Sequence, residues 1–321
     1  MKHYPRPGPR VRGSTTGADG VHDGTTHAAT VVARLGAAVA VEDGHGGLVC
    51  CVIPRRIEAP VCGDRIRWRP TGAGAGVLTA LEPRRSLLAR PDARGRLRPL
   101  AANVDQLVVV VAPAPPAGPD LIDRYLIAAE HEGLAALLLL HKEDLLEADT
   151  RPGWTQRAAH YRALGYPVIT ASAHTGTGLG PLARGLAGRT SILVGQSGVG
   201  KSSLVNALIP DREARVGLLS AATGLGCHTT STTTFYPLPE GGALIDSPGV
   251  RQFGLGPLNA EHLAAGFVEF RPYLGQCRFR DCRHRVEPGC ALRAAVDAGA
   301  VTRERYERFL QIQQELAREA G

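Results

Sequence analysis

A glycine-rich segment in the second half of the chain constrains the fold more than any other feature of the sequence. It reads Gly195-Gln196-Ser197-Gly198-Val199-Gly200-Lys201-Ser202 and fits the pattern G-x-x-x-x-G-K-[ST] at every position. An apolar run at 191–194 precedes it and an amphipathic stretch at 203–208 follows, so it is predicted to connect a buried strand to a helix. In such a loop, backbone amides surround phosphates, the lysine reaches the β- and γ-phosphate oxygens, and the serine hydroxyl binds Mg²⁺. The predicted phosphate-binding residues are Gly195, Gln196, Ser197, Gly198, Val199, Gly200, Lys201, Ser202 and Ser203.

A second phosphate-binding segment, Asp246-Ser247-Pro248-Gly249, ends the apolar run 243–246. A carboxylate at the end of a strand can hold Mg²⁺, and the Gly249 amide can reach the γ-phosphate. The threonine-rich segment 224–234 lies between the two motifs and is predicted to sense the γ-phosphate through Thr230, with Thr229 as the alternative. The predicted Mg²⁺ ligands are therefore Ser202, Thr230 and Asp246.

Two short segments earlier in the chain are predicted to select the base. His141-Lys142-Glu143-Asp144 follows the apolar run 135–140, and Ser172-Ala173 follows the run 167–170. A carboxylate at 144 can accept hydrogen bonds from both guanine N1–H and the exocyclic amino group, a donor pair that adenine lacks. The lysine stem can lie along the base plane, and a backbone amide near 172–173 completes the pocket. The predicted guanine-binding residues are His141, Lys142, Glu143, Asp144, Ser172 and Ala173, with histidine at the position where the usual motif has asparagine.

The order of these motifs is unusual, because the base-binding segments precede the phosphate-binding ones. Ordinary GTPases run in the opposite order, so the chain is predicted to be circularly permuted, which is feasible because domain termini often lie close together. Apolar runs alternating with helical patterns predict a parallel sheet covered on both faces. The expected strands of this α/β part are 106–112, 135–140, 167–170, 191–194 and 243–246, and the expected helices are 119–132, 155–164 and 203–208.

The predicted architecture is a multidomain α/β protein. Residues 1–28 are expected to form a disordered basic arm, and 29–98 an OB-type barrel built from five short strands. Residues 99–255 form the permuted P-loop GTPase domain and 256–321 a helical zinc-binding domain, with helices at 259–270 and 302–320. The expected barrel strands are 30–35, 38–41, 48–53, 65–69 and 77–81.

Three of the seven cysteines and one histidine lie near the C-terminus with metal-ligand spacing. Cys277, Cys282, His284 and Cys290 would form a closed tetrahedral shell typical of one structural Zn²⁺. A formal net charge of +7 raises the expectation of an anionic partner. The zinc segment concentrates that charge, which predicts contact with RNA phosphates through Arg271, Arg278, Arg280, Arg283, Arg285 and Arg293.

The permuted order, the segments 195–203 and 246–249, the linker 102–105 and the Cys₃His spacing together resemble the RsgA (YjeQ) family of circularly permuted TRAFAC-class GTPases. The resemblance covers residue 29 to the C-terminus. It implies a barrel, a permuted GTPase domain and a zinc domain, with GTP, Mg²⁺ and one Zn²⁺ bound. It also implies GTP hydrolysis that the 30S ribosomal subunit stimulates, a role in late small-subunit maturation, and contact with 16S rRNA.

The resemblance raises the question of how the attacking water is oriented. Family members carry a hydrophobic residue in place of the catalytic glutamine after D-x-P-G, and here that residue is Val250. Because valine cannot orient water, we hypothesise that His228 does so, with Lys201 and Thr230 as the other catalytic residues.

Two other functions stay open from the residues alone. One is an RNA-binding module that GTP gates with negligible turnover, and the other is a P-loop ATPase with a zinc-ribbon domain, for which Asp144 would be incidental. The longest apolar run, 107–114, is far shorter than the roughly 20 residues of a membrane helix, and no secretory signal is visible. We therefore expect a cytoplasmic, monomeric protein without a membrane partner.

Overall fold

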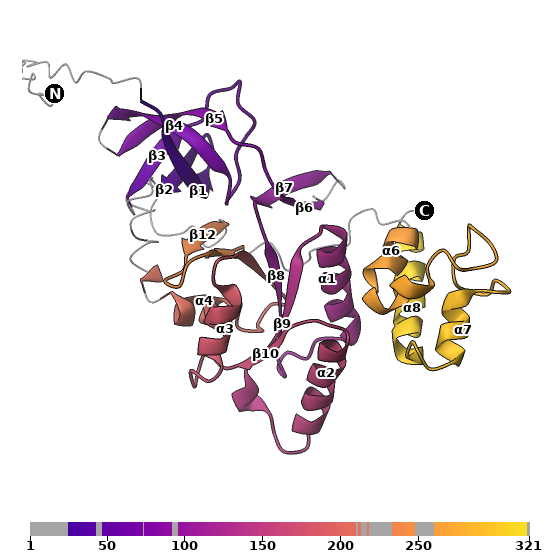
Figure 1. Ribbon diagram of the computed structural model, residues 1–321. Coiled ribbons are helices and arrows are strands. Elements are labelled where there is room, and N and C mark those ends of the chain that lie inside the picture. The colour runs from indigo at the N-terminus through magenta and orange to yellow at the C-terminus, as the bar shows by residue number, and fades with distance from the viewer. Residues whose placement is uncertain are drawn as a thin grey trace, which may run out of the picture.

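The computed structural model describes residues 25–42, 47–72, 74–91, 96–209, 211–212, 217, 233–247 and 260–319. It has three parts in chain order: a barrel, an α/β domain and a helical domain (Figure 1). This arrangement confirms the predicted fold class. Several predicted features lie outside the described residues, namely the arm as far as residue 24 and His228, Thr229, Thr230, Gly249 and Val250.

Five strands close into the N-terminal barrel. Their order is β1-β2-β3-β5-β4, and β4 pairs back onto β1, which gives the OB topology. Alternate residues face inward, so the interior holds side chains such as Val31, Ile66 and Leu78. The strands are β1 (His27–Leu35), β2 (Ala38–Glu42), β3 (Leu48–Val52), β4 (Arg65–Gly72) and β5 (Ala75–Leu81), close to the predicted runs.

A two-stranded hairpin between the barrel and the α/β domain was not expected from the sequence. It pairs β6 (Leu87–Pro91) with β7 (Leu97–Ala102) in an antiparallel arrangement. Prolines and arginines interrupt both strands, so neither shows the alternation that identifies a half-buried strand.

The α/β domain is built on a parallel sheet in the order β10-β9-β8-β11-β13, as the apolar runs predict. The antiparallel strand β12 (Thr234–Pro237) covers one edge and pairs with β1 at Ala33 and Thr234, so the barrel and the sheet are continuous. β12 was not predicted, because four residues that include a proline give little pattern. The parallel strands are β8 (Gln106–Val111), β9 (Ala135–His141), β10 (Val168–Ala171), β11 (Thr190–Val194) and β13 (Ala243–Asp246).

Helices follow the strands of this sheet. Helix α2 begins four residues before its predicted start, because Pro152 suits the first turn of a helix, where no amide donor is required. The sequence pattern does not predict the short helix α3 (Leu179–Leu186). The helices are α1 (Pro119–His131), α2 (Arg151–Ala163), α3 (Leu179–Leu186) and α4 (Lys201–Leu208), with a 3₁₀ turn η1 (Glu143–Leu145) after β9.

The predicted continuous helix over 259–270 is wrong. Helix α6 (Ala260–Gly266) ends at Gly266, and a 3₁₀ segment η3 (Val268–Tyr273) follows. A Cβ atom at Gly266 would lie 2.5 Å from Ile127 Cγ2, so glycine is needed for α6 to approach α1 this closely. The predicted metal segment also contains an unexpected helix, α7 (Ala291–Asp297), before the predicted C-terminal helix α8 (Arg303–Glu319).

Helix α1 packs against the helical domain (Figure 1). One hydrophobic core runs through both parts and includes Ile127 on α1 and the stacked rings of Phe267 and Phe270, which Phe309 meets edge-on. Buried charges join the same elements: Asp123 on α1 pairs with Arg305 on α8, whose guanidinium also lies 4.6 Å from the Phe267 ring centroid. The helical domain is therefore fixed to the α/β domain by apolar and ionic contacts together.

The barrel is fixed to the α/β domain by a buried asparagine. Asn103 has a left-handed φ of 56°, and its side-chain amide donates to the Gly63 carbonyl at 2.9 Å. The Ala102 amide donates to the Cys62 carbonyl at 2.9 Å, and a Cβ at Gly63 would lie 2.3 Å from the Ala102 carbonyl oxygen. In the described parts of the chain, every helix is too short or too polar to cross a membrane.

Candidate functional site

The glycine-rich loop runs from β11 into α4, as its motif predicts. Gly195 has φ 143° and Gly200 has φ 94°, a region that favours glycine. A Cβ at Gly195 would also lie 2.2 Å from the Val110 carbonyl oxygen. The Lys201 ammonium folds into the loop and donates to the carbonyls of Gly195 at 2.7 Å and Gln196 at 2.6 Å. The loop thus surrounds a fixed positive charge, which suits the binding of phosphates.

Oxygen atoms that could hold a divalent cation lie on two neighbouring elements, α4 and β13. Ser202 and Ser203 are exposed in the first turn of α4, and Asp246 ends β13, the strand beside β11. Hydroxyl and carboxylate oxygens are the donors that Mg²⁺ prefers, so the described residues fit this ion. Burial raises the pKa of Asp246, and the nearby Arg212 and Lys201 oppose that change.

Arg212 is a part of this site that the sequence did not reveal. Its guanidinium donates to Asp246 Oδ2 at 2.9 Å and to Asn206 Oδ1 at 2.5 Å, and it lies 5.8 Å from the Tyr236 ring centroid. No motif links these positions, and the contact depends on how α4, β12 and β13 pack. The arginine therefore supplies the counter-charge of Asp246 in this structure.

The predicted base-binding segment at the end of β9 contacts the glycine-rich loop. Lys142 has a left-handed φ of 58°, and its ammonium donates to the carbonyls of Ala114 at 2.9 Å and Gly198 at 2.6 Å. Asp144 is exposed, and a hydrogen bond with the Ser172 hydroxyl is the main cause of its lowered pKa. An ionised carboxylate at 144 is able to accept the donor pair of guanine.

His141 is buried and joins the two halves of the site. Its Nδ1 lies 2.8 Å from the Val199 carbonyl oxygen, and its Nε2 lies 3.1 Å from the Ala173 amide nitrogen. Burial is the main cause of its lowered pKa. The Ala173 amide, which the sequence assigns to the base, therefore donates to His141 in this structure.

The loops that follow β9, β10, β11 and β13 meet at the carboxyl edge of the parallel sheet, where ligands bind in open α/β folds. The structure brings together the segments 141–144, 172–173 and 195–203 with Asp246. The predicted catalytic residues His228 and Thr230 and the predicted γ-phosphate residue Gly249 lie outside the described residues.

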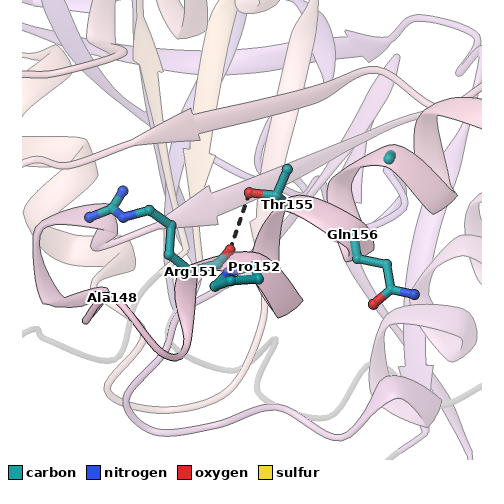
Figure 2. Close-up of a pocket in the computed structure, with 6 residues that line it drawn as sticks. Ala148, Arg151, Pro152, Thr155 and Gln156 are labelled. Carbon is teal, nitrogen blue, oxygen red and sulfur yellow. Dashed lines mark hydrogen bonds between the residues drawn. The ribbon is translucent and has the colours of Figure 1, made fainter.

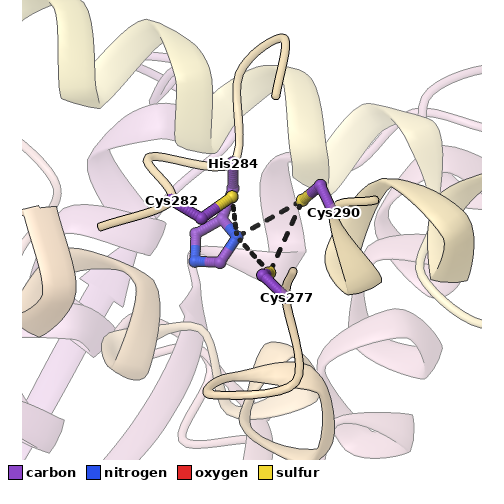
Figure 3. A group of neighbouring side chains, drawn as sticks. All are labelled: Cys277, Cys282, His284 and Cys290. Carbon is purple, nitrogen blue, oxygen red and sulfur yellow. Dashed lines mark hydrogen bonds between the residues drawn. The ribbon is translucent and has the colours of Figure 1, made fainter. Parts of the chain in front are cut away.

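The four predicted metal ligands converge in the helical domain (Figure 3), where their ligand atoms all lie within 4.8 Å of one another. His284 Nδ1 lies 3.4 Å from the Sγ atoms of Cys277 and Cys290 and 3.6 Å from that of Cys282. A tetrahedral Zn²⁺ with bonds of about 2.0–2.3 Å separates its ligands by about 3.5–3.8 Å. The donor set and its spacing therefore fit a tetrahedral metal ion.

Neighbouring groups hold this metal loop in shape. His284 has a left-handed φ of 60°, and its carbonyl accepts a hydrogen bond of 2.6 Å from the Tyr306 hydroxyl on α8. The Glu287 carboxylate accepts from the amides of Arg283, Arg285 and Val286. Burial alone would raise the pKa of Glu287, but these backbone hydrogen bonds lower it to about 2.

The predicted arginine cluster divides into two groups. Arg271 is paired with Glu130 on α1 at 2.5 Å, and Arg293 donates to the Glu287 carbonyl, so both have partners within the protein. The exposed arginines of the metal loop are Arg278, Arg280, Arg283 and Arg285. Two apolar side chains on the same loop are also exposed, Phe279 and Val286.

A separate depression of 520 Å³ lies at the start of α2 (Figure 2). It is lined by Arg151, Pro152, Thr155 and other residues of that helix, and the Thr155 hydroxyl donates to the Arg151 carbonyl at 3.1 Å. Its lining shares no residue with the nucleotide or metal sites, so we assign it no role.

Comparison with known proteins gives consistent matches. A 276-residue match to the small ribosomal subunit biogenesis GTPase RsgA of Chromohalobacter salexigens is 52% identical and covers 85% of this chain and 81% of that protein. The protein of the same name from Pseudomonas aeruginosa PAO1 is 50% identical over 88% of this chain and 83% of its own length.

Solved structures agree with the sequence matches. YjeQ from Thermotoga maritima superposes with a TM-score of 0.75 at 31% identity, covering 91% of this chain and 99% of that one. YloQ, described as a circularly permuted GTPase, superposes with a TM-score of 0.72 at 26% identity, covering 94% and 99%. The profile of the RsgA GTPase family matches residues 81–256. The chain therefore belongs to the RsgA family of circularly permuted GTPases.

Proposed function

We propose that this GTPase binds the 30S ribosomal subunit late in its maturation and that the subunit stimulates hydrolysis of GTP. The observation that carries the proposal is the hydrogen bond from Lys142 to Gly198, which joins the predicted base-binding segment to the phosphate-binding loop. The same chain exposes four arginines on its metal loop, where they can meet RNA phosphates. The name of the relatives, small ribosomal subunit biogenesis GTPase, supports the same partner.

The residues of the site have separate roles in this proposal. Lys201 binds the β- and γ-phosphate oxygens, and Asp144 accepts the hydrogen bonds of guanine. Ser202, Thr230 and Asp246 hold Mg²⁺, which when bound neutralises charge on the phosphates. Arg212 donates to the Oδ2 atom of Asp246 at 2.9 Å, so Mg²⁺ bound directly through that oxygen would compete with this hydrogen bond. Gly249 reaches the γ-phosphate, and His228 orients the attacking water.

The metal loop acts as the RNA-binding surface of the same proposal. The Cys₃His group holds one Zn²⁺, which fixes the loop so that exposed arginines contact phosphates of 16S rRNA. The protein works as a monomer, and a ribosomal partner places its activity in the cytoplasm.

Hydrolysis of GTP by the zinc-loaded protein, alone and with 30S subunits, tests the proposal most directly. The controls are 50S subunits, and ATP in place of GTP. We expect GTP-selective turnover that rises at least tenfold with 30S alone. Tight GTP binding without stimulation would instead favour the GTP-gated RNA-binding module, and hydrolysis of ATP would favour the P-loop ATPase.

A second measurement tests the water-orienting residue separately. We expect His228→Ala to lower 30S-stimulated turnover and to leave the affinity for GDP unchanged, because GDP binding needs no attacking water. Unchanged stimulated turnover would show that another group orients the water.

A further inference from the structure

The position of His141 in the fold makes it a link between three loops. It is the last residue of β9, it pairs with Ala171 at the end of β10, and only 2% of its surface is exposed. Strand β8 separates β9 from β11, so the imidazole reaches across the end of β8 to the phosphate loop.

The two hydrogen bonds of His141 determine which nitrogen carries the proton. The Val199 carbonyl is an acceptor, so Nδ1 at 2.8 Å must donate to it. The Ala173 amide is a donor, so Nε2 at 3.1 Å must accept from it. The pair of partners therefore requires a neutral imidazole with the proton on Nδ1.

The phosphate loop is shaped around this ring. A Cβ atom at Gly200 would lie 2.5 Å from His141 Cε1 and 2.7 Å from Nδ1, so the ring fills the space that glycine leaves. The adjacent Lys142 contacts the same loop at the Gly198 carbonyl. The two neighbouring side chains thus contact successive parts of the loop.

We infer that His141, as a neutral Nδ1–H imidazole, is a positioning residue that sets the spacing between the phosphate loop and both base-binding segments. It does not need to touch the nucleotide. The inference rests on the proposed guanine-nucleotide site and adds a condition to it: binding requires an unprotonated His141.

Protonation would break the link on one side. An N–H at Nε2 would point at the Ala173 N–H, which replaces an attraction with a repulsion. The charged groups that face the ring are Lys142, which disfavours the imidazolium, and Asp144, which favours it. Burial disfavours the imidazolium most and is the main reason that the pKa of His141 lies below its usual value.

Equilibrium binding of a fluorescent GDP analogue between pH 5 and pH 8 tests the inference. His141→Ala loses hydrogen bonds to one buried and one partly buried backbone group, so we expect its affinity at pH 7.5 to fall about 10- to 100-fold. His141→Asn keeps one donor and one acceptor but does not titrate, so most of the affinity should return. We expect the wild-type affinity to fall as the pH drops, relative to that of His141→Asn, which corrects for titration of the nucleotide itself.

A matched control separates His141 from other titrating histidines. His160 on α2 also has a pKa lowered mainly by burial and lies outside the nucleotide site, so His160→Asn should keep the wild-type pH profile. If His141→Asn kept the wild-type profile, or if His141→Ala bound GDP as tightly as wild type, the inference would be overturned.

Nitrogen-15 NMR of the imidazole reports the tautomer without any nucleotide. We expect the His141 signals of an Nδ1–H ring at pH 7.5, and an Nε2–H ring would contradict the inference. Failure of the wild type to bind GDP at pH 7.5 would instead refute the proposed nucleotide site, so the two failures are distinguishable.

Discussion

At the scale of single residues, Gly200 carries two constraints at once: a φ of 94° and the presence of the His141 ring. We expect Gly200→Ala to weaken GDP binding at least tenfold, because the new methyl group displaces the imidazole. Gly165→Ala is the matched control, since Gly165 has φ 91° with no atom within 4 Å of an added Cβ. Equal losses of affinity in the two variants would show that general destabilisation by backbone strain, and not the collision with His141, is responsible.

The ion pair of Arg212 with Asp246 is a second residue-scale feature. We expect Arg212→Met to lower the free energy of unfolding without nucleotide by about 1–3 kcal/mol, because a partly buried carboxylate loses a charged donor. Urea denaturation measures this change. The exposed Arg184 serves as the control, and its replacement by methionine should stay within about 0.5 kcal/mol of wild type.

At the scale of elements, we expect the metal loop over 277–290 to depend on a bound ion for its shape, whereas α8 packs into the apolar core. We expect Cys282→Ser to lose the metal and to raise amide hydrogen exchange through 277–290, while the half of α8 around Phe309 stays protected. Metal analysis with exchange mass spectrometry checks both. Cys50→Ser in β3 should retain one metal ion per chain, and loss of protection throughout α8 would contradict the prediction.

The elements also show what a sequence pattern can predict. Long apolar runs such as 106–111 identify buried strands, and motif spacing identified the ligands that converge in the metal loop. The hairpin of β6 and β7 and the edge strand β12 were missed, because short strands with prolines are specified by neighbours distant in sequence. The bond from His141 to Val199 spans 58 positions and could not be read from a local motif.

At the scale of the whole molecule, buried charge fixes the helical domain to the α/β domain. Asp123 is fully buried and forms ion pairs with Arg305 and Arg308. Arg305→Met removes one of the two positive charges that neutralise this buried carboxylate. We expect a loss of about 3–5 kcal/mol in unfolding free energy, measured by denaturation. Arg303 lies on the same helix as Arg305 and makes an exposed pair with Asp297 of α7, so Arg303→Met should cost less than about 1 kcal/mol.

The buried His141 and the half-buried His160 make the stability of the whole protein depend on pH. The pKa values of His141 and His160 are lowered in the folded state, so the unfolded chain binds protons first as the pH falls through about 6.5. Folding stability should therefore decrease as the pH is lowered below that value. Denaturation at pH 7.5 and pH 5.5 measures the change, and the double variant His141→Asn/His160→Asn should show a smaller one.

The permuted sheet has a consequence for synthesis of the chain on a ribosome. Strand β8 lies between β9 and β11 in the sheet, yet Val111 at its end and Thr190 at the start of β11 are 79 positions apart. At about 5–20 residues per second, roughly 4–16 s pass before the second neighbour of β8 has been made. During that interval the nascent protein presents an apolar strand with a free hydrogen-bonding edge. The central strand of the finished domain is thus open to mispairing along one edge while the protein is being made.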